Sequence, residues 1–174
     1  SEDKANKLDF RTKNEAAGQL DSAQVICATT TGTTKPPLCS VSFPVQLHEE
    51  AGQATELSTL VAVSNGCQQL ILVGDPKQLP PTVKSTEAEK GRLSMSMLQR
   101  LLTAQVPHVT LDIQYRCHSA ISEYPMQQIY HGVYSNGPDV DKQGAPLGFP
   151  WPRPTKPLCV VTVGNQDGDD LEET

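Results

Sequence analysis

The sequence predicts an α/β fold with a mainly parallel sheet, because predicted strands alternate with predicted helices along most of the chain. One of these strands, Leu70–Val73, is an unbroken run of large apolar residues, which is typical of a strand buried on both faces of a parallel sheet. A turn at Gly74 ends the run. Ligands bind beyond the carboxyl ends of such strands, so Asp75 and Gln78 lie where chemistry is expected.

The composition of the chain is that of an ordinary soluble domain, with 174 residues, a net charge of -6 and 37% hydrophobic residues. No apolar run approaches the roughly 18 residues of a membrane span, and the charged first residues argue against a secretory signal. The five cysteines are far apart and form no C-x-x-C, which argues against a disulfide framework or a zinc site. We therefore expect a reducing compartment, namely the cytoplasm, with the nucleus as an additional location. The acidic charge argues against a generally basic surface for nucleic acid but leaves a local groove open.

The first part of the chain predicts three short elements. Residues 2–20 have a loosely helical spacing of apolar residues, and Gly18 lies near the end of this predicted helix. Val25–Ala28 predicts a short buried strand. The hydroxyl-rich segment Thr29–Thr34 follows it and is interpreted as a turn, with hydrogen bonds to phosphates as the alternative.

The next two elements lead to the strand at Leu70. Phe43–His48 predicts a strand, and its proline and alternating pattern indicate a half-exposed or edge position. Ala54–Ser64 predicts a helix that closes before the next strand begins. The apolar residues expected to face the core from this helix are Leu57, Leu60 and Val61.

The second half predicts two helical segments, two strands and a long loop. Ser94–Ala104 predicts a helix with apolar residues at core spacing, and Val109–Ile113 predicts a strand. Ser119–Tyr130 predicts one or two short helical turns interrupted by a proline. Asn136–Pro157, rich in Gly and Pro, predicts a linker or long loop, and Leu158–Val163 predicts a final strand.

Three polar segments carry the candidate chemistry. Glu49 and Glu50 follow a predicted strand, where one carboxylate can hold Mg²⁺ through water and the other can act on an attacking water. Asp75 can bind metal-coordinated water while Gln78 reaches a terminal phosphate. Arg116 can neutralise charge on a transferring phosphoryl group. Taken alone, the pair Glu49–Glu50 is more typical of a solvated acidic turn, Gly74–Asp75 of an ordinary turn and Arg116 of a surface residue.

Considered together and in order, four segments resemble helicase motifs. They are similar to motifs Ic, II, III and IV of the superfamily 1B helicases and comprise Ala23–Gly32, Glu49–Glu56, Leu72–Pro81 and Leu111–His118. Within that superfamily, Gly148–Pro152 and the following strand resemble the nonsense-mediated-decay RNA helicases.

The resemblance implies a fold and an activity. The fold is part of a RecA-like P-loop NTPase sheet, with residues 1–112 as the end of the first RecA-like domain and residues 113–174 as the start of the second. The activity is ATP-dependent translocation on single-stranded RNA or DNA, in nonsense-mediated mRNA decay. ATP and Mg²⁺ are the implied cofactors. Single-stranded nucleic acid and mRNA-decay proteins are the implied partners, with no membrane.

Position by position, the resemblance also assigns roles to residues. It gives water activation to Glu50, sensing of the terminal phosphate to Gln78 and stabilisation of the transition state to Arg116. The residues implied to bind the nucleotide are Glu49, which would also hold Mg²⁺ through water, Gln53, Asp75 and Gln114. The residues implied to contact the backbone of a single strand are Thr29, Thr30 and Thr31.

The sequence departs from the family pattern in three places. Glu49 stands where the family has Asp, and Gln46 and His48 stand where it has apolar residues. No G-x-x-x-x-G-K-[ST] loop occurs in the sequence. The resemblance therefore implies an internal helicase fragment that is inactive alone. The competing hypothesis is a non-catalytic, helicase-derived binding or regulatory module, and a third makes DNA the substrate.

Overall fold

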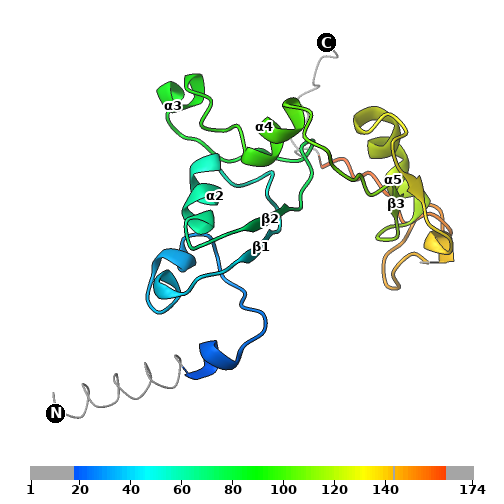
Figure 1. Ribbon diagram of the computed structural model, residues 1–174. Coiled ribbons are helices and arrows are strands. Elements are labelled where there is room, and N and C mark those ends of the chain that lie inside the picture. Colours follow the sequence, from blue (N-terminus) through cyan, green and yellow to red (C-terminus); the bar gives the residue numbers. More distant parts are fainter. Residues whose placement is uncertain (1–17, 143, 164–174) are drawn as a thin grey trace, which may run out of the picture. The chain divides into compact units, whose positions relative to one another are not determined.

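The computed structural model describes residues 18–142 and 144–163, and the chain divides into two compact units (Figure 1). Unit 1 comprises residues 1–108 and unit 2 comprises residues 109–174. This division lies close to the domain boundary predicted after residue 112. The assignment of the units to two RecA-like domains stays a prediction.

Unit 1 is built on a parallel strand pair joined by a helix (Figure 1). Strand β1 (Val45–His48) pairs in parallel with β2 (Gln69–Leu72), with Val45 opposite Gln69 and His48 opposite Leu72. Helix α2 (Glu56–Val63) connects them, as a parallel pair requires. These elements agree with the predicted α/β class, whereas the larger RecA-like sheet stays a prediction.

The prediction that the apolar strand is buried on both faces is wrong. In the part of the chain that the structure describes, the sheet of unit 1 has two strands, and both alternate between exposed and half-buried residues. Leu47 is 62% exposed and Ile71 is 39% exposed. Helix α2 lies against the face that carries Gln46, whose Nε2 donates a hydrogen bond of 3.1 Å to the Ala62 carbonyl. Leu47 and Ile71 point to the opposite face, where they are exposed.

Helix α2 turns a different face inward from the one predicted. Its buried residues are Thr59 and Ala62, three positions apart on one side of the helix. The residues predicted to face the core are exposed instead, at 61% for Leu57, 46% for Leu60 and 41% for Val61. Small side chains let the helix approach the sheet closely enough for the Gln46 hydrogen bond.

Two further helices complete unit 1. Helix α4 (Met97–Thr103) begins at Ser96, whose hydroxyl accepts a hydrogen bond from Gln99 N, and its Met97 is buried. The helix predicted over Ser94–Ala104 is thus confirmed with a later start. Helix α3 (Thr86–Lys90) is short and was not predicted.

Unit 2 contains a second, smaller parallel pair. Strand β3 (Ile113–Gln114) pairs with β4 (Ser135–Asn136), with Gln114 opposite Asn136. Helix α5 (Ser119–Tyr124) continues into a π-helical turn, η3 (Pro125–Ile129), which confirms two helical turns interrupted at the proline. A 3-10 turn, η4 (Val140–Lys142), follows β4.

Three predicted strands do not form as predicted. Val25–Ala28 and Leu158–Val163 are irregular, and of Val109–Ile113 only the last residue belongs to a strand. Their apolar side chains are largely exposed, at 80% for Val25 and 90% for Val163. An apolar run becomes a strand only when a neighbouring backbone accepts and donates its hydrogen bonds.

The remaining local elements are short. The structure shows 3-10 turns η1 (Gly32–Thr34) and η2 (Leu38–Ser40), and residues 18–22 are helical. Most of the helix predicted over residues 2–20 lies outside the described residues. Among the described helices, none has the length and apolar character needed to cross a membrane.

Candidate active site

The candidate site lies at the carboxyl ends of β1 and β2. Glu49 and Glu50 follow β1 directly and are both exposed, and Glu50 has a left-handed backbone with a φ of 54°. The next residue, Ala51, is buried and donates a hydrogen bond of 2.9 Å from its N–H to the Val73 carbonyl. This bond holds the acidic turn against the end of β2.

Two glycines bring the loops after the strands into contact. A Cβ at Gly52 would lie 2.9 Å from the Asp75 carbonyl oxygen, and a Cβ at Gly74 would lie 2.9 Å from Gly52 N. Neither position has room for a larger side chain. The structure therefore places the loop with Glu50 beside the loop with Asp75 and Gln78.

Within each loop a glutamine holds a carboxylate. Gln53 Nε2 donates to Glu50 Oε2 at 3.1 Å, and Gln78 Nε2 donates to Asp75 Oδ2 at 3.1 Å. The other Asp75 oxygen accepts a hydrogen bond of 2.9 Å from Lys77 N. Both carboxylates are thus oriented by hydrogen bonds inside the site.

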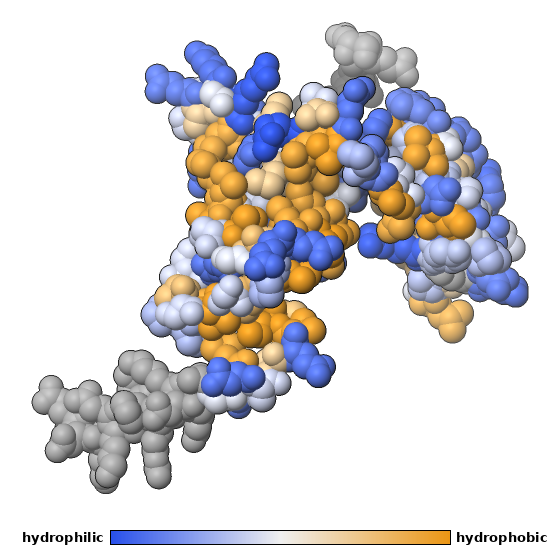
Figure 2. All heavy atoms as spheres, viewed as in Figure 1, coloured by the Kyte–Doolittle hydropathy of each residue, from blue (hydrophilic) through white to orange (hydrophobic). Residues whose placement is uncertain are grey.

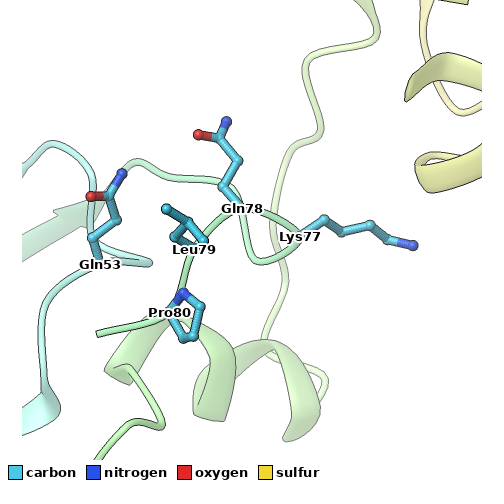
Figure 3. Close-up of a pocket in the computed structure, with 5 residues that line it drawn as sticks. All are labelled: Gln53, Lys77, Gln78, Leu79 and Pro80. Carbon is cyan, nitrogen blue, oxygen red and sulfur yellow. The ribbon is translucent and has the colours of Figure 1, made fainter. Parts of the chain in front are cut away.

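An open pocket lies between these loops (Figure 3). Its volume is about 330 Å³, and its lining residues are Gln53, Lys77, Gln78, Leu79 and Pro80. In Figure 3 the amides of Gln53 and Gln78 extend to the same side, and Lys77 extends away from Gln53. Its lining combines the two amides with Lys77 and with the apolar side chains of Leu79 and Pro80, a mixture of apolar and polar groups that is typical of ligand pockets.

The carboxylates fit a magnesium ion held largely through water. Among the described residues, no three Asp, Glu, His or Cys side chains gather closely enough to hold a metal directly. Mg²⁺ is usually bound by one or two carboxylates together with waters and substrate phosphates. Glu49 and Asp75 offer such hard oxygen ligands, and the role of Glu49 in holding the ion stays a prediction.

The polar residues of β1 now have structural positions. Gln46 binds the backbone of α2, as described above. His48 Nδ1 is buried and has no hydrogen-bond partner among the described residues, and burial lowers the pKa of this imidazole. His48 is therefore neutral at neutral pH, one position before Glu49.

The threonine segment forms the predicted turn. Thr29 Oγ1 accepts a hydrogen bond of 3.1 Å from Gly32 N, while Thr33 Oγ1 donates to the Thr30 carbonyl at 2.6 Å. Thr34 Oγ1 donates to the Thr31 carbonyl at 2.8 Å. The contact of Thr29, Thr30 and Thr31 with nucleic acid stays a prediction.

Two predicted site residues lie in unit 2. Arg116 is exposed, and its backbone N–H donates to Gln114 Oε1 at 2.9 Å. The Gln114 side chain is half-buried and makes several hydrogen bonds within unit 2. Contact of either residue with a nucleotide stays a prediction.

Several residues that hold the predicted site residues in place could not be recognised from the sequence. Gly52 and Gly74 lie in the predicted loops, yet their mutual contact joins loops that follow two different strands. Asn136 binds Gln114 from 22 residues away and falls in a segment predicted as loop. Lys77 lines the pocket but resembles any exposed lysine in the sequence.

Comparisons with known proteins give consistent matches over nearly the whole chain. Two families, each described as an AAA domain, match residues 1–86 and residues 93–174. The regulator of nonsense transcripts 1 homolog of Drosophila melanogaster is 36% identical over 166 residues, which cover 94% of this chain and 14% of that protein. Helicase SEN1 of Saccharomyces cerevisiae is 36% identical over 135 residues, 76% of this chain and 6% of SEN1. The regulator of nonsense transcripts 1 of Caenorhabditis elegans is 36% identical over 139 residues, 79% of this chain and 13% of that protein.

Proposed function

This chain belongs to the superfamily 1B helicases, in the group of regulator of nonsense transcripts 1, and we propose that it forms part of an ATP-dependent RNA helicase. The observation that carries the proposal is the contact between the loops after β1 and β2, which brings Glu50 beside Asp75 and Gln78. In this proposal units 1 and 2 are parts of two RecA-like domains.

The side chains of the site have distinct tasks in ATP hydrolysis. Glu50 orients and deprotonates the attacking water, and Gln53 holds its carboxylate in place. Gln78 binds the terminal phosphate, and Arg116 stabilises the charge that develops on the transferring phosphoryl. Glu49 and Asp75 would hold Mg²⁺ through water, and the bound ion would supply positive charge beside the phosphates.

The chain does not contain the whole of this machinery. Its sequence has no G-x-x-x-x-G-K-[ST] loop, whose backbone N–H groups and lysine bind the triphosphate. We expect this chain alone to show little or no ATPase activity. The phosphate-binding loop would come from residues outside this sequence.

The proposed substrate is single-stranded RNA, with DNA as the alternative. The turn of Thr29, Thr30 and Thr31 would contact the sugar-phosphate backbone with hydroxyl and backbone groups, which read no base sequence. The proposed setting is nonsense-mediated mRNA decay in the cytoplasm, together with mRNA-decay proteins. Competition between RNA and DNA strands of equal length would decide the substrate.

The test is ATP hydrolysis by the full-length gene product in the presence of single-stranded RNA. Glu50→Gln should lower kcat by about 10²–10⁴-fold, the usual contribution of a general base, with little change in RNA binding. Glu87→Gln in α3 removes the same charge from an exposed position outside the site and should leave kcat unchanged. ATPase activity that survives Glu50→Gln would contradict the role of Glu50.

A non-catalytic, helicase-derived module is the second candidate. Two observations favour it, namely Glu49 at the position of the family Asp and the polar side chains of Gln46 and His48 in β1. In this case the full-length product would bind RNA without hydrolysing ATP. The same assay therefore separates the two candidates.

A further inference from the structure

Unit 2 contains a compact set of hydrogen bonds centred on the side-chain amide of Gln114. Its Nε2 donates to Asn136 Oδ1 at 2.6 Å and to the Cys117 carbonyl at 2.8 Å. Its Oε1 accepts from Arg116 N at 2.9 Å, from Cys117 N at 3.0 Å and, over a longer distance of 3.6 Å, from Cys117 Sγ. An amide has two hydrogens and two lone pairs, so all four are used within the unit.

The partner of this amide is itself anchored. Asn136 Oδ1 also accepts a hydrogen bond of 2.7 Å from Ser122 Oγ, and Ser122 in α5 is 2% exposed. The backbone pairing of β3 with β4 holds Gln114 opposite Asn136, and Gly137 N donates to the Gln114 carbonyl at 2.8 Å. Gln114 is thereby fixed to both α5 and β4.

The turn that carries Arg116 is held on both sides. The ring of Tyr115 lies so close to Gly137 that a Cβ there would overlap it. The backbone N–H groups of Arg116 and Cys117 are both bound by Gln114 Oε1. The backbone beneath Arg116 is thus fixed, while its side chain is exposed.

We propose that Gln114 is a positioning residue, which acts with Asn136 and Ser122 to fix the turn that carries Arg116. The inference rests on the proposed function, in which Arg116 stabilises charge on the transferring phosphoryl. A cation on a fixed backbone needs less rearrangement to reach the transition state, and a misplacement of about 1 Å can cost about 100-fold in rate. This role differs from the nucleotide contact that the family resemblance implies for Gln114, because its amide is already saturated.

The first experiment measures the network itself in this chain. Gln114→Met keeps the length of the side chain but removes every hydrogen bond that its amide makes. Amide hydrogen exchange at Arg116 and Cys117 should become at least about 10-fold faster, because each N–H loses its partner. Gln128→Met, the same change at an exposed glutamine of unit 2, should leave both amides protected. Unchanged protection in Gln114→Met would overturn the proposal.

The second experiment measures catalysis in the full-length gene product. Gln114→Met should lower kcat about 100-fold with an unchanged KM for ATP, because substrate binding does not require a well-placed Arg116. Arg116→Ala should lower kcat by about 10³-fold or more. The double variant should be no slower than Arg116→Ala alone, since Gln114 acts only through Arg116. A further loss in the double variant, or a raised KM with normal kcat, would contradict the proposal.

The experiments distinguish a failure of the role proposed for Arg116 from a failure of the positioning role proposed for Gln114. A normal kcat in Arg116→Ala would overturn the role proposed for Arg116, and the catalytic part of this inference with it. A reduced kcat in Arg116→Ala together with a normal kcat in Gln114→Met would overturn the positioning role alone.

A pair of variants at Asn136 provides a conservative rescue. Asn136→Asp keeps an oxygen that accepts from Gln114 and Ser122, whereas Asn136→Leu removes it. Amide protection at Arg116 and kcat should therefore be higher in Asn136→Asp than in Asn136→Leu. Equal losses of amide protection and kcat in the two variants would show that the hydrogen bonds to Asn136 do not position Arg116, and would contradict the proposal.

Discussion

At the scale of single residues, Gly74 has the tightest backbone environment in the site. A Cβ there would meet Gly52 N at 2.9 Å, Leu98 Cδ2 at 3.0 Å and Ala51 N at 3.1 Å. Two of these three neighbours are backbone atoms, which cannot move as a flexible side chain can. Only glycine fits at this position, because neighbouring atoms occupy the space that a Cβ would need. The φ angle of Gly74 is not the reason, since it lies outside the left-handed region.

We expect Gly74→Ala to lower the free energy of unfolding by about 1–3 kcal/mol, the usual cost of an overpacked site. The two loops would also separate, which would move Glu50 away from Asp75. Urea unfolding followed by circular dichroism would measure the first effect. Gly18→Ala, at a position with nothing within 4 Å, is the matched control and should not destabilise the chain.

Two polar residues of β1 show how one strand differs from its family pattern. The Gln46 amide is bound to the α2 backbone, so this polar side chain is satisfied. The buried His48 Nδ1 has no partner among the described residues, and an unpaired buried polar atom is costly. Gln46 therefore stabilises the packing of α2 against the sheet, whereas the unpaired Nδ1 of His48 does not.

At the scale of elements, α2 and α4 are joined by an ion pair. Arg100 Nε lies 2.9 Å from both carboxylate oxygens of Glu56, and Arg100 Nη2 lies 2.6 Å from Glu56 Oε1. The hydrogen bonds from Arg100 lower the pKa of Glu56 below its usual value of 4.5. Glu56 is also the first residue of α2, where a negative charge is favourable.

The ion pair gives unit 1 a pH-dependent stability. Since the pKa of Glu56 is lower in the folded unit, the stabilisation is complete above pH 4.5 and is lost as the pH falls through the lowered value. We expect Arg100→Met to reduce stability slightly at neutral pH and to flatten its decline below pH 4.5. Lys90→Met, an exposed cation in α3, should leave the profile unchanged. Identical profiles for Arg100→Met and the unmodified chain would show that the pair contributes nothing.

At the scale of the whole molecule, few large apolar side chains are buried in the part of the chain that the structure describes. Among the described residues, the buried hydrophobic ones are Ala51, Ala62, Met97 and Val140. Figure 2 shows hydrophobic atoms gathered at the surface of unit 1, and Val45, Leu47 and Val73 are among the exposed residues. Large exposed apolar areas are characteristic of surfaces that bind another protein segment.

We expect the isolated chain to bind a hydrophobic dye such as anilinonaphthalene sulfonate and to melt over a broad temperature range. The reason is that so small a buried core supplies little cooperative stabilisation. Dye fluorescence and a thermal melt would measure this, with the full-length gene product as the control. A sharp transition without dye binding would contradict the expectation.

The sequence by itself determined the local features of this protein. The strand before Glu49, the strand before Gly74 and the helix between them follow from short-range patterns of apolar, capping and turn residues. The family resemblance likewise depends on motifs that are contiguous in the chain. These elements could be predicted because each depends on residues that are close together in the chain.

Only the tertiary structure decided which faces and residues meet. The sequence could not show that α2 turns Thr59 inward, because that choice depends on Gln46 of another element. It could not show that Val25–Ala28 lacks a strand partner, because pairing depends on a distant backbone. The bond between Gln114 and Asn136 joins residues 22 positions apart, and such contacts are set by how the elements pack and not by the pattern within either one.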